Sequence, residues 1–464
     1  MGDDPLTTSP SAIRVDVASL IDDRPVSALQ FRVFIVCALI ALLDGVCSQG
    51  IGVAAPMMRE ALGVTTVTFS WAFSAGLFGA AIGAMTFGPI ADRIGRKPAL
   101  VFAVALFGLM TLATALASSF PLLLLYRFAA GLGLGGAIPC FVTLGAEYAP
   151  ARRRAMYTSL SWSAFPLGNA VGGFMNAYLI ANFAWPMVFV AAALPTLLTA
   201  LLLPFLIPES LRFQASRGRS NAQTERVIRT IDPKLPAGPV EPFMPAESGK
   251  GAKIPFVDLF TDGRATGTIL LGLILLLGFA TTTVAVLQTP TLLLRGWNIP
   301  PATSSALVGV FSIMSVCGMA IAGRLVERFG PAGGLAPAFI CGAVLLASLG
   351  YVATSPPALT VVMGLLGFAV PLGASGTIAL TATFYPTAMR SAGTGWAMGL
   401  GRFGQVLSPL VIGLMIALAW APANIFVAMA AAPLLAGVCV ILHATFSRGG
   451  VPSPVPLAAG SRAP

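Results

Sequence analysis

The chain has 464 residues, of which 56% are hydrophobic and only 9% are charged, and its mean hydropathy is +0.88. Soluble domains carry about 25% charged residues, so this composition excludes a string of soluble domains and indicates an integral membrane protein. The net charge of +10 does not indicate nucleic-acid binding, because the basic residues lie in short connections between apolar segments and in one longer linker.

The first 30 residues are polar and contain several aspartates. They lack the basic stretch that opens a signal peptide, and the apolar run that follows is too long for one. We interpret residues 1–30 as a cytoplasmic N-terminal tail that precedes a retained membrane span.

A helix needs about 20 apolar residues to cross the hydrocarbon core. Twelve segments meet this requirement: 31–56, 68–90, 98–117, 121–147, 155–180, 184–207, 266–290, 302–323, 332–353, 357–384, 390–418 and 422–445. The predicted fold is an all-α membrane protein with twelve transmembrane helices in two six-helix halves, 31–207 and 266–445. Residues 208–265 form a polar cytoplasmic linker, partly helical around 221–231, and 446–464 a cytoplasmic C-terminal tail.

The distribution of Lys and Arg predicts the orientation of the chain. All but four of the 27 basic residues fall on the side that carries both termini. Arg59 and Arg295 fall on the opposite side, and Arg127 and Arg402 fall within spans. Because basic loops stay in the cytoplasm, both termini are expected there.

A repeated turn motif indicates a duplication. The stretch from Gly88 to Lys97 connects two spans, and its glycine, acid, arginine and glycine recur from Gly323 to Gly330 at an offset of 235 residues. Since each half holds an even number of spans, both have the same orientation. Transporters with such repeats bind substrate near the midplane, between the halves.

Charges inside spans are candidates for function because their burial is costly. Asp44, Arg127 and Arg402 are the deep ones; with a rise of about 1.5 Å per residue, Asp44 and Arg402 lie roughly 20 and 18 Å from the cytoplasmic side. Two arginines that stay protonated thus share the interior with one carboxylate. We expect an organic anion to bind at Arg127 and Arg402, with Gln49 and Gln288 lining the same site and Asp44 exchanging a proton.

Structural alternatives remain open for these charges. Arg127 and Asp44 could form a static pair that only positions helices, and Arg402 could cap backbone carbonyls at a helix break. Glu147, at the cytoplasmic end of span four, is expected to pair with Arg152–Arg154. The glycine run from Gly131 to Gly136 lies mid-span and indicates close helix packing rather than a nucleotide loop.

No cofactor and no metal are expected. The six cysteines lie singly in apolar stretches and His443 is the only histidine. An enzyme needs a nucleophile with an oriented base, or metal ligands, and a sensor needs a larger soluble domain than 208–265 provides.

Several of these motifs resemble those of the major facilitator superfamily: Gly88 to Lys97, Glu327-Arg328, and Arg127-Phe128 followed by Gly131. Within it, the chain is similar to the aromatic acid:H⁺ symporters, including hydroxybenzoate, protocatechuate and hydroxyphenylpropionate permeases. That likeness is carried by Leu43-Asp44-Gly45, Gly52 to Pro56, Gly131 to Ala137, Tyr385 to Arg390 and Gly401-Arg402.

The resemblance implies proton-driven uptake of a small aromatic carboxylate across the bacterial inner membrane, with Asp44 and Arg127 required. It also implies a cytoplasmic conformational gate formed by Gly88, Asp92, Arg93, Gly95, Arg96, Glu147, Glu327 and Arg328. One departure is Cys47, which stands where the family usually has a second acid. The expected partners are a small organic anion, protons and the lipid bilayer, for a monomer that binds no nucleic acid.

Two other functions remain open on the same fold. The protein could export drugs or metabolites, or it could be a symporter of a non-aromatic organic anion. The sequence does not identify the substrate.

Overall fold

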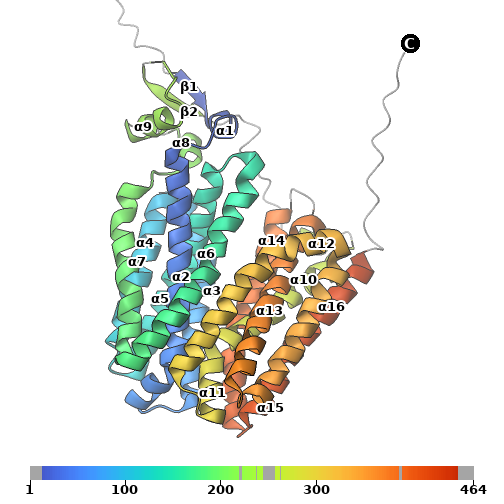
Figure 1. The fold of residues 1–464 in the computed structure, drawn as a ribbon. Coiled ribbons are helices and arrows are strands. Elements are labelled where there is room, and N and C mark those ends of the chain that lie inside the picture. Colours follow the sequence, from blue (N-terminus) through green and yellow to red (C-terminus); the bar gives the residue numbers. More distant parts are fainter. Residues whose placement is uncertain are drawn as a thin grey trace, which may run out of the picture.

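The computed structural model describes residues 13–218, 222–236, 238–243, 256–261, 263–385 and 389–447 (Figure 1). The first six membrane helices are α2 (Ala28–Ala61), α3 (Thr66–Ile94), α4 (Arg96–Ala115), α5 (Phe120–Tyr148), α6 (Arg154–Asn182) and α7 (Pro186–Leu206). The second set comprises α10 (Ala265–Thr283), the π-helix η4 (Val284–Gln288), α11 (Thr289–Trp297), α12 (Pro301–Val352), α13 (Pro356–Phe384), α14 (Arg390–Ala417), α15 (Pro422–Met429) and α16 (Ala431–Ser447).

Glycines with positive φ mark equivalent points in the two halves. Gly95, with φ +112°, ends α3, and Gly330, with φ +70°, breaks α12 at the position 235 residues later. Only glycine adopts such angles without strain, so the duplicated motif produces the same turn twice. Of the described segments, ten are long and apolar enough to span a membrane. One of them, α12, crosses twice, and α6, which packs along α2 and α12, adds the twelfth crossing. The predicted fold is confirmed.

The apolar core joins the two halves on one side only. We call the side with β1 and the end of α16 the terminal side, and the other the opposite side (Figure 1). On the opposite side one cluster contains residues of both halves, such as Ile51 and Phe69 with Leu287 and Phe311. On the terminal side each half has its own core, one around Phe141 and one around Phe339.

Polar contacts also join the halves away from the terminal side. Ser305 Oγ donates to the backbone oxygen of Gly173 at 2.7 Å, and Ser74 Oγ donates to that of Val406 at 2.9 Å. The halves are therefore locked together on the opposite side and separate on the terminal side.

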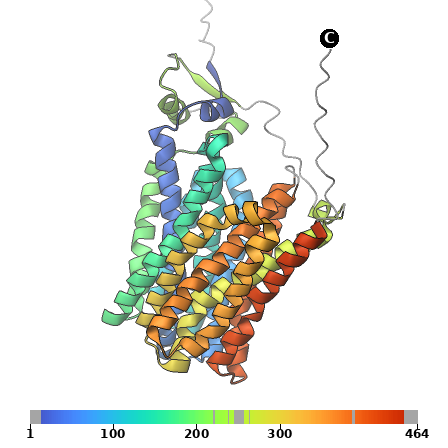
Figure 2. The ribbon, with the colours of Figure 1, turned by 45° about the vertical axis from the view of Figure 1, so that its right-hand side comes forward.

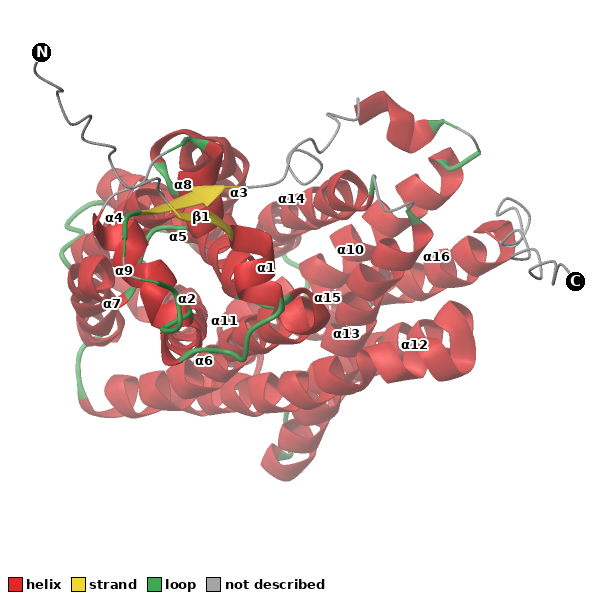
Figure 3. Cartoon of the chain, turned by 90° about the horizontal axis from the view of Figure 1, so that it is seen from above, coloured by secondary structure: helices red, strands yellow, loops and turns green. Residues whose placement is uncertain are grey.

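The N-terminal segment and the linker fold together, which corrects the expectation of a polar tail and a solvated linker. The helix expected around 221–231 is present at Ala222–Ile231. Strand β1 (Ile13–Asp16) pairs in parallel with β2 (Val240–Phe243), next to α1 (Val17–Asp22), α8 (Leu211–Ser216) and α9 (Ala222–Ile231). Figures 2 and 3 show this small unit lying over the first six helices. Its apolar residues Val17, Ile21 and Ile228 belong to the core of that half. Most of the predicted C-terminal tail and part of the linker lie outside the described residues.

Close glycine packing holds α5 against its neighbours. A Cβ on Gly131 would overlap the carbonyl oxygen of Gly76, and one on Gly135 would overlap that of Ala80, both in α3. The expectation that this glycine run serves helix packing is confirmed, because small residues are what permit such close approach between membrane helices.

We predict that Gly135→Ala destabilises the protein, because the added methyl must push α3 and α5 apart. Overpacking of this kind costs about 1–3 kcal/mol. The apparent melting temperature in detergent measures the effect. Gly399→Ala is the matched control, since a Cβ there meets no atom within 4 Å; equal melting temperatures for the two variants would contradict the close-packing account.

Candidate functional site

A central cavity of about 210 Å³ lies between the two halves. It is lined by residues of α2, α3, α5 and α6 from the first half and of α10, η4, α12, α13 and α14 from the second, with a single residue from α4. Much of its wall is aromatic: Phe73, Phe107, Trp162, Phe165, Phe279 and Phe311. An apolar cavity with a few convergent polar groups is typical of a small-molecule site.

Asp44 is the carboxylate of this cavity. It lies in the middle of α2 and is 4% exposed. Its carboxylate is hydrogen-bonded by Ser48, one turn later, whose hydroxyl donates both to the backbone oxygen of Asp44 at 2.8 Å and to Oδ1 at 3.2 Å. The second carboxylate oxygen is therefore available to a proton or a ligand.

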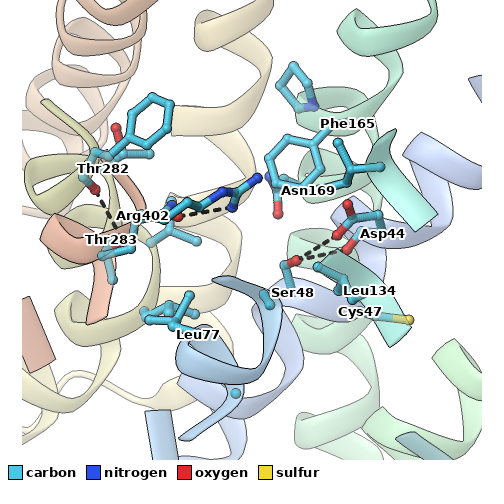
Figure 4. A pocket seen from close by; sticks show the side chains of 18 of the residues that line it. Asp44, Cys47, Ser48, Leu77, Leu134, Phe165, Asn169, Thr282, Thr283 and Arg402 are labelled. Atoms are coloured by element: carbon cyan, nitrogen blue, oxygen red, sulfur yellow. Dashed lines mark hydrogen bonds between the residues drawn. The ribbon is translucent and has the colours of Figure 1, made fainter. Parts of the chain in front are cut away.

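Arg402 enters the cavity from α14 in the other half. Figure 4 shows its side chain pointing across the cavity toward Asn169 and Asp44. Nη1 donates to Oε1 of Gln405 at 3.0 Å. Arg402 and Asp44 attract each other electrostatically, but they form no ion pair within 4 Å in the described structure. The guanidinium is thus held by a neutral amide and faces the carboxylate from a distance.

Arg127 lines the cavity from α5 and has no acid partner among the described residues. Its Nε is buried and makes no hydrogen bond. The static pair of Arg127 with Asp44, offered above as a structural alternative, does not form in the described structure, where Asp44 faces Arg402. The predicted excess of positive charge remains: the cavity holds two guanidinium groups and one carboxylate.

The two glutamines predicted for the substrate site lie outside the cavity wall. Gln49 is fully buried and its Nε2 donates to the backbone oxygen of Asn169 and, at 3.4 Å, to Ser312 Oγ in the other half, so it joins the halves. Gln288 lines a separate small pocket on the opposite side. Sequence reasoning missed Asn169, which lines the cavity and whose Oδ1 is buried without a partner.

Cys47 occupies the position, one turn after Asp44 in α2, where a second acid would be expected. The residue contributes to the cavity wall. Its thiol lies 3.6 Å from the backbone oxygen of Ala192 and 3.8 Å from Thr196 Oγ1, both in α7. The position thus supplies a small neutral group that contacts a peripheral helix.

The first copy of the turn motif is connected by ion pairs within its own half. Arg96 pairs with Asp92 at 2.5 Å and with Glu147 at 3.5 Å. Glu147 was expected to pair with Arg152–Arg154, but Arg152 and Arg153 are exposed and its ion pair is with Arg96. Arg217 of the linker donates to the backbone oxygens of Asp92 and Arg93, which ties the small αβ unit to the same turn.

Glu209 lies at this turn and belongs to the sequence Pro208-Glu209-Ser210, which also resembles the family but to which sequence reasoning gave no role. Its Oε1 accepts from the backbone N–H groups of Arg96 at 2.9 Å and Lys97 at 3.2 Å, the first residues of α4. A carboxylate at a helix N-terminus is stabilised by the unpaired N–H groups there. A Cβ on Gly95 would overlap this carboxylate, so the glycine is required by close approach as well as by its positive φ.

The second copy of the motif is not connected in this way. Glu327 and Arg328 are exposed and form no ion pair in the part of the chain that the structure describes, and Arg328 lies over the ring of Phe329 at 5.3 Å. A Cβ on Gly88, in the first copy, would meet no described atom within 4 Å.

The described residues also contain no group of three or more His, Cys, Asp or Glu that could hold a metal ion.

A cavity between two repeated six-helix halves, closed on one side by a shared core, defines a transporter of the alternating-access class. The chain belongs to the Major Facilitator Superfamily, whose family model matches residues 37–357 and 270–463. It is therefore a multi-pass membrane protein of a transporter family, not an enzyme.

The chain is also similar to individual transporters of this superfamily. The chain is 33% identical to the gallate transporter of Pseudomonas putida, over 87% of this chain and 89% of that protein. It is 31% identical to the 4-hydroxybenzoate transporter PcaK of Pseudomonas aeruginosa, over 94% and 98%. Among solved structures, a D-xylose-proton symporter matches with a TM-score of 0.68 at 19% identity, over 91% of this chain and 98% of that one, which shows the shared fold.

We predict that Glu209→Gln weakens the turn between α3 and α4, because a neutral amide interacts less strongly with the helix N-terminus and the two N–H groups. Charge-assisted hydrogen bonds contribute about 1.5–3 kcal/mol, so the melting temperature in detergent should fall. Glu225→Gln is the control, since Glu225 forms only a half-exposed pair with Arg229 in α9. A Glu209→Gln protein as stable as Glu225→Gln would refute this role.

Proposed function

We propose that the protein imports a small aromatic carboxylate together with protons across the bacterial inner membrane. The observation that carries the proposal is the unbalanced charge of the cavity, in which Arg127 and Arg402 outnumber Asp44. An anion with a flat apolar body fits such a wall, because guanidinium groups bind carboxylates through paired N–H donors and aromatic side chains pack on rings. The named substrates of the relatives, gallate and 4-hydroxybenzoate, are molecules of this kind.

The structure corresponds to an inward-facing state in this proposal. The terminal side, where the two cores are separate, is the side that carries nearly all the basic residues, and basic loops are cytoplasmic. Both termini are then cytoplasmic and the closed opposite side faces the periplasm. The protein acts as a monomer, since each chain contains a complete cavity between its own halves.

Proton coupling follows from competition for Arg402. When Asp44 is protonated, its attraction for Arg402 is lost and both guanidinium groups are free to bind the anion. When Asp44 releases its proton toward the cytoplasm, its carboxylate again attracts Arg402 and favours release of the substrate. Because Cys47 supplies no second carboxyl group, we propose one titrating acid in the cavity.

In this mechanism Asp44→Asn abolishes accumulation of 4-hydroxybenzoate driven by an imposed pH gradient, because the amide is permanently neutral. Exchange of labelled for unlabelled substrate at equal pH should survive, since it needs no net proton movement. Asp258→Asn, outside the membrane helices, is the control and should accumulate like wild type. Full accumulation by Asp44→Asn would remove the coupling role. Export instead of uptake under an inward proton gradient would refute import.

Arg127→Gln should weaken binding of the carboxylate, because it removes the guanidinium that lacks an acid partner. Loss of a charge-assisted hydrogen bond costs about 1.5–3 kcal/mol, or roughly 10- to 100-fold in Kd. The measurement is the Kd of 4-hydroxybenzoate for the purified protein, with Arg152→Gln, an exposed residue, as the control for loss of one positive charge. Unchanged affinity in Arg127→Gln would place the carboxylate elsewhere.

A further inference from the structure

A second, smaller pocket lies on the opposite side of the central cavity. It is lined by Arg59 of α2, by Thr66, Phe69, Ser70 and Phe73 of α3, and by Gln288 and Thr291 of η4 and α11, with Ala55 and Pro56. Phe73 also lines the central cavity. This one aromatic side chain therefore stands between the two spaces, with Phe69 packed on it edge to face at a ring-centroid distance of 5.5 Å.

Two buried polar groups of this pocket lack a hydrogen-bond partner in the described structure. Gln288 is 3% exposed and Thr291 is 6% exposed. Yet Nε2 of Gln288 and Oγ1 of Thr291 make no hydrogen bond with any described residue. Buried polar groups are nearly always hydrogen-bonded, so two unpaired groups in one small pocket point to a hydrogen-bonding partner that the protein itself does not supply.

Arg59 supplies a positive charge to the same pocket. Its guanidinium contacts Oγ1 of Thr66. It forms no ion pair with any acid that the structure describes, and the adjacent Glu60 is exposed. A guanidinium, an amide N–H and a hydroxyl that converge on one space are complementary to a carboxylate, which only accepts hydrogen bonds.

The pocket lies on the seam between the halves. Arg59 and Thr66 belong to the first half, and Gln288 and Thr291 belong to the second. In this structure the space holds little more than a water molecule. Because its lining comes from both halves, separation of the halves on the opposite side would widen this space and expose it to a substrate arriving from that side.

We propose that this pocket is the outer entry site for the substrate, where Arg59, Gln288 and Thr291 bind the carboxylate of an aromatic acid before it reaches the central cavity. The inference rests on the proposed import of aromatic carboxylates. The ring of the substrate packs against Phe69 and Phe73, and movement of Phe73 then admits it to Arg127 and Arg402. Because the entry site binds the carboxylate first, it does not bind neutral aromatic molecules at the periplasmic opening of the transporter.

The test compares Arg59→Gln with Arg295→Gln in proteoliposomes of fixed orientation. Both residues are arginines of the opposite side, so both variants lose the same charge there, but Arg295 is exposed in α11 and does not line the pocket. For 4-hydroxybenzoate presented to the periplasmic face, Arg59→Gln should raise KM about five- to tenfold and leave the maximal rate nearly unchanged. The KM for substrate presented to the cytoplasmic face should stay at the wild-type value.

Two results would overturn the entry site. One is a periplasmic KM for Arg59→Gln equal to that for Arg295→Gln, and the other is an equal rise in KM at both faces, which would indicate an effect on the central cavity. If Arg59→Gln fails to fold, the entry site is tested with Arg59→Lys and Gln288→Leu instead. Each should raise the KM two- to threefold for substrate presented to the periplasmic face, and leave the KM at the cytoplasmic face unchanged. Wild-type protein that transports no aromatic carboxylate would refute the proposed function, whereas transport with unaltered variants would refute the entry site only.

Discussion

The structure depends on placing two guanidinium groups and one carboxylate in a cavity that the membrane surrounds. Charged groups at this depth are costly unless they are paired, and here the pairing is incomplete. Asp44 faces Arg402 without forming an ion pair, and Arg127 has no acid partner in the described chain. In the mechanism that we propose, a mobile anion completes this set of charges during each transport cycle.

The remainder of the fold allows the cavity that holds these three charged groups to open to one side of the membrane at a time. On the opposite side the two halves share one apolar core, and on the terminal side they have separate cores. The first half is further stiffened on the terminal side by Arg96, Glu147 and Glu209 and by the αβ unit that docks there. The second half has no equivalent bracing at Glu327 and Arg328 in the described structure. We infer that the halves move as separate bodies about the closed side, with the first half as the more rigid one.

Much of the fold could be predicted from the sequence because the bilayer imposes a length and a composition on every span. The twelve segments and the deep charges at Asp44, Arg127 and Arg402 follow from that constraint, and the equivalent turns at Gly95 and Gly330 follow from the repeated motif. Helix rotation does not follow from it: Gln49 and Gln288 lie in the predicted spans, but Gln49 is hydrogen-bonded to Asn169 and Ser312 and Gln288 lines the smaller pocket. The partners of Glu147 and Glu209 depend on how the ends of distant helices meet, which no local pattern encodes.

Of the small αβ unit only the helix around 221–231 was predicted, and its strands and their packing were missed for a different reason. Its strands are four residues long and lie far apart in the chain, so each alone resembles a polar connection. The alternation of Ile13, Val15 and Val17 and the apolar face of α9 at Val227, Ile228 and Ile231 were the available signals.

The most direct measurement of the central claim compares the binding of 4-hydroxybenzoate and of 4-hydroxybenzamide to the purified wild-type protein. The two molecules have nearly the same shape and differ in charge. If unbalanced guanidinium groups hold the substrate, the carboxylate should bind at least about 100-fold more tightly than the amide, which corresponds to about 2.7 kcal/mol. Equal affinity for both would contradict the account, because it would show that the cavity selects the ring and not the charge.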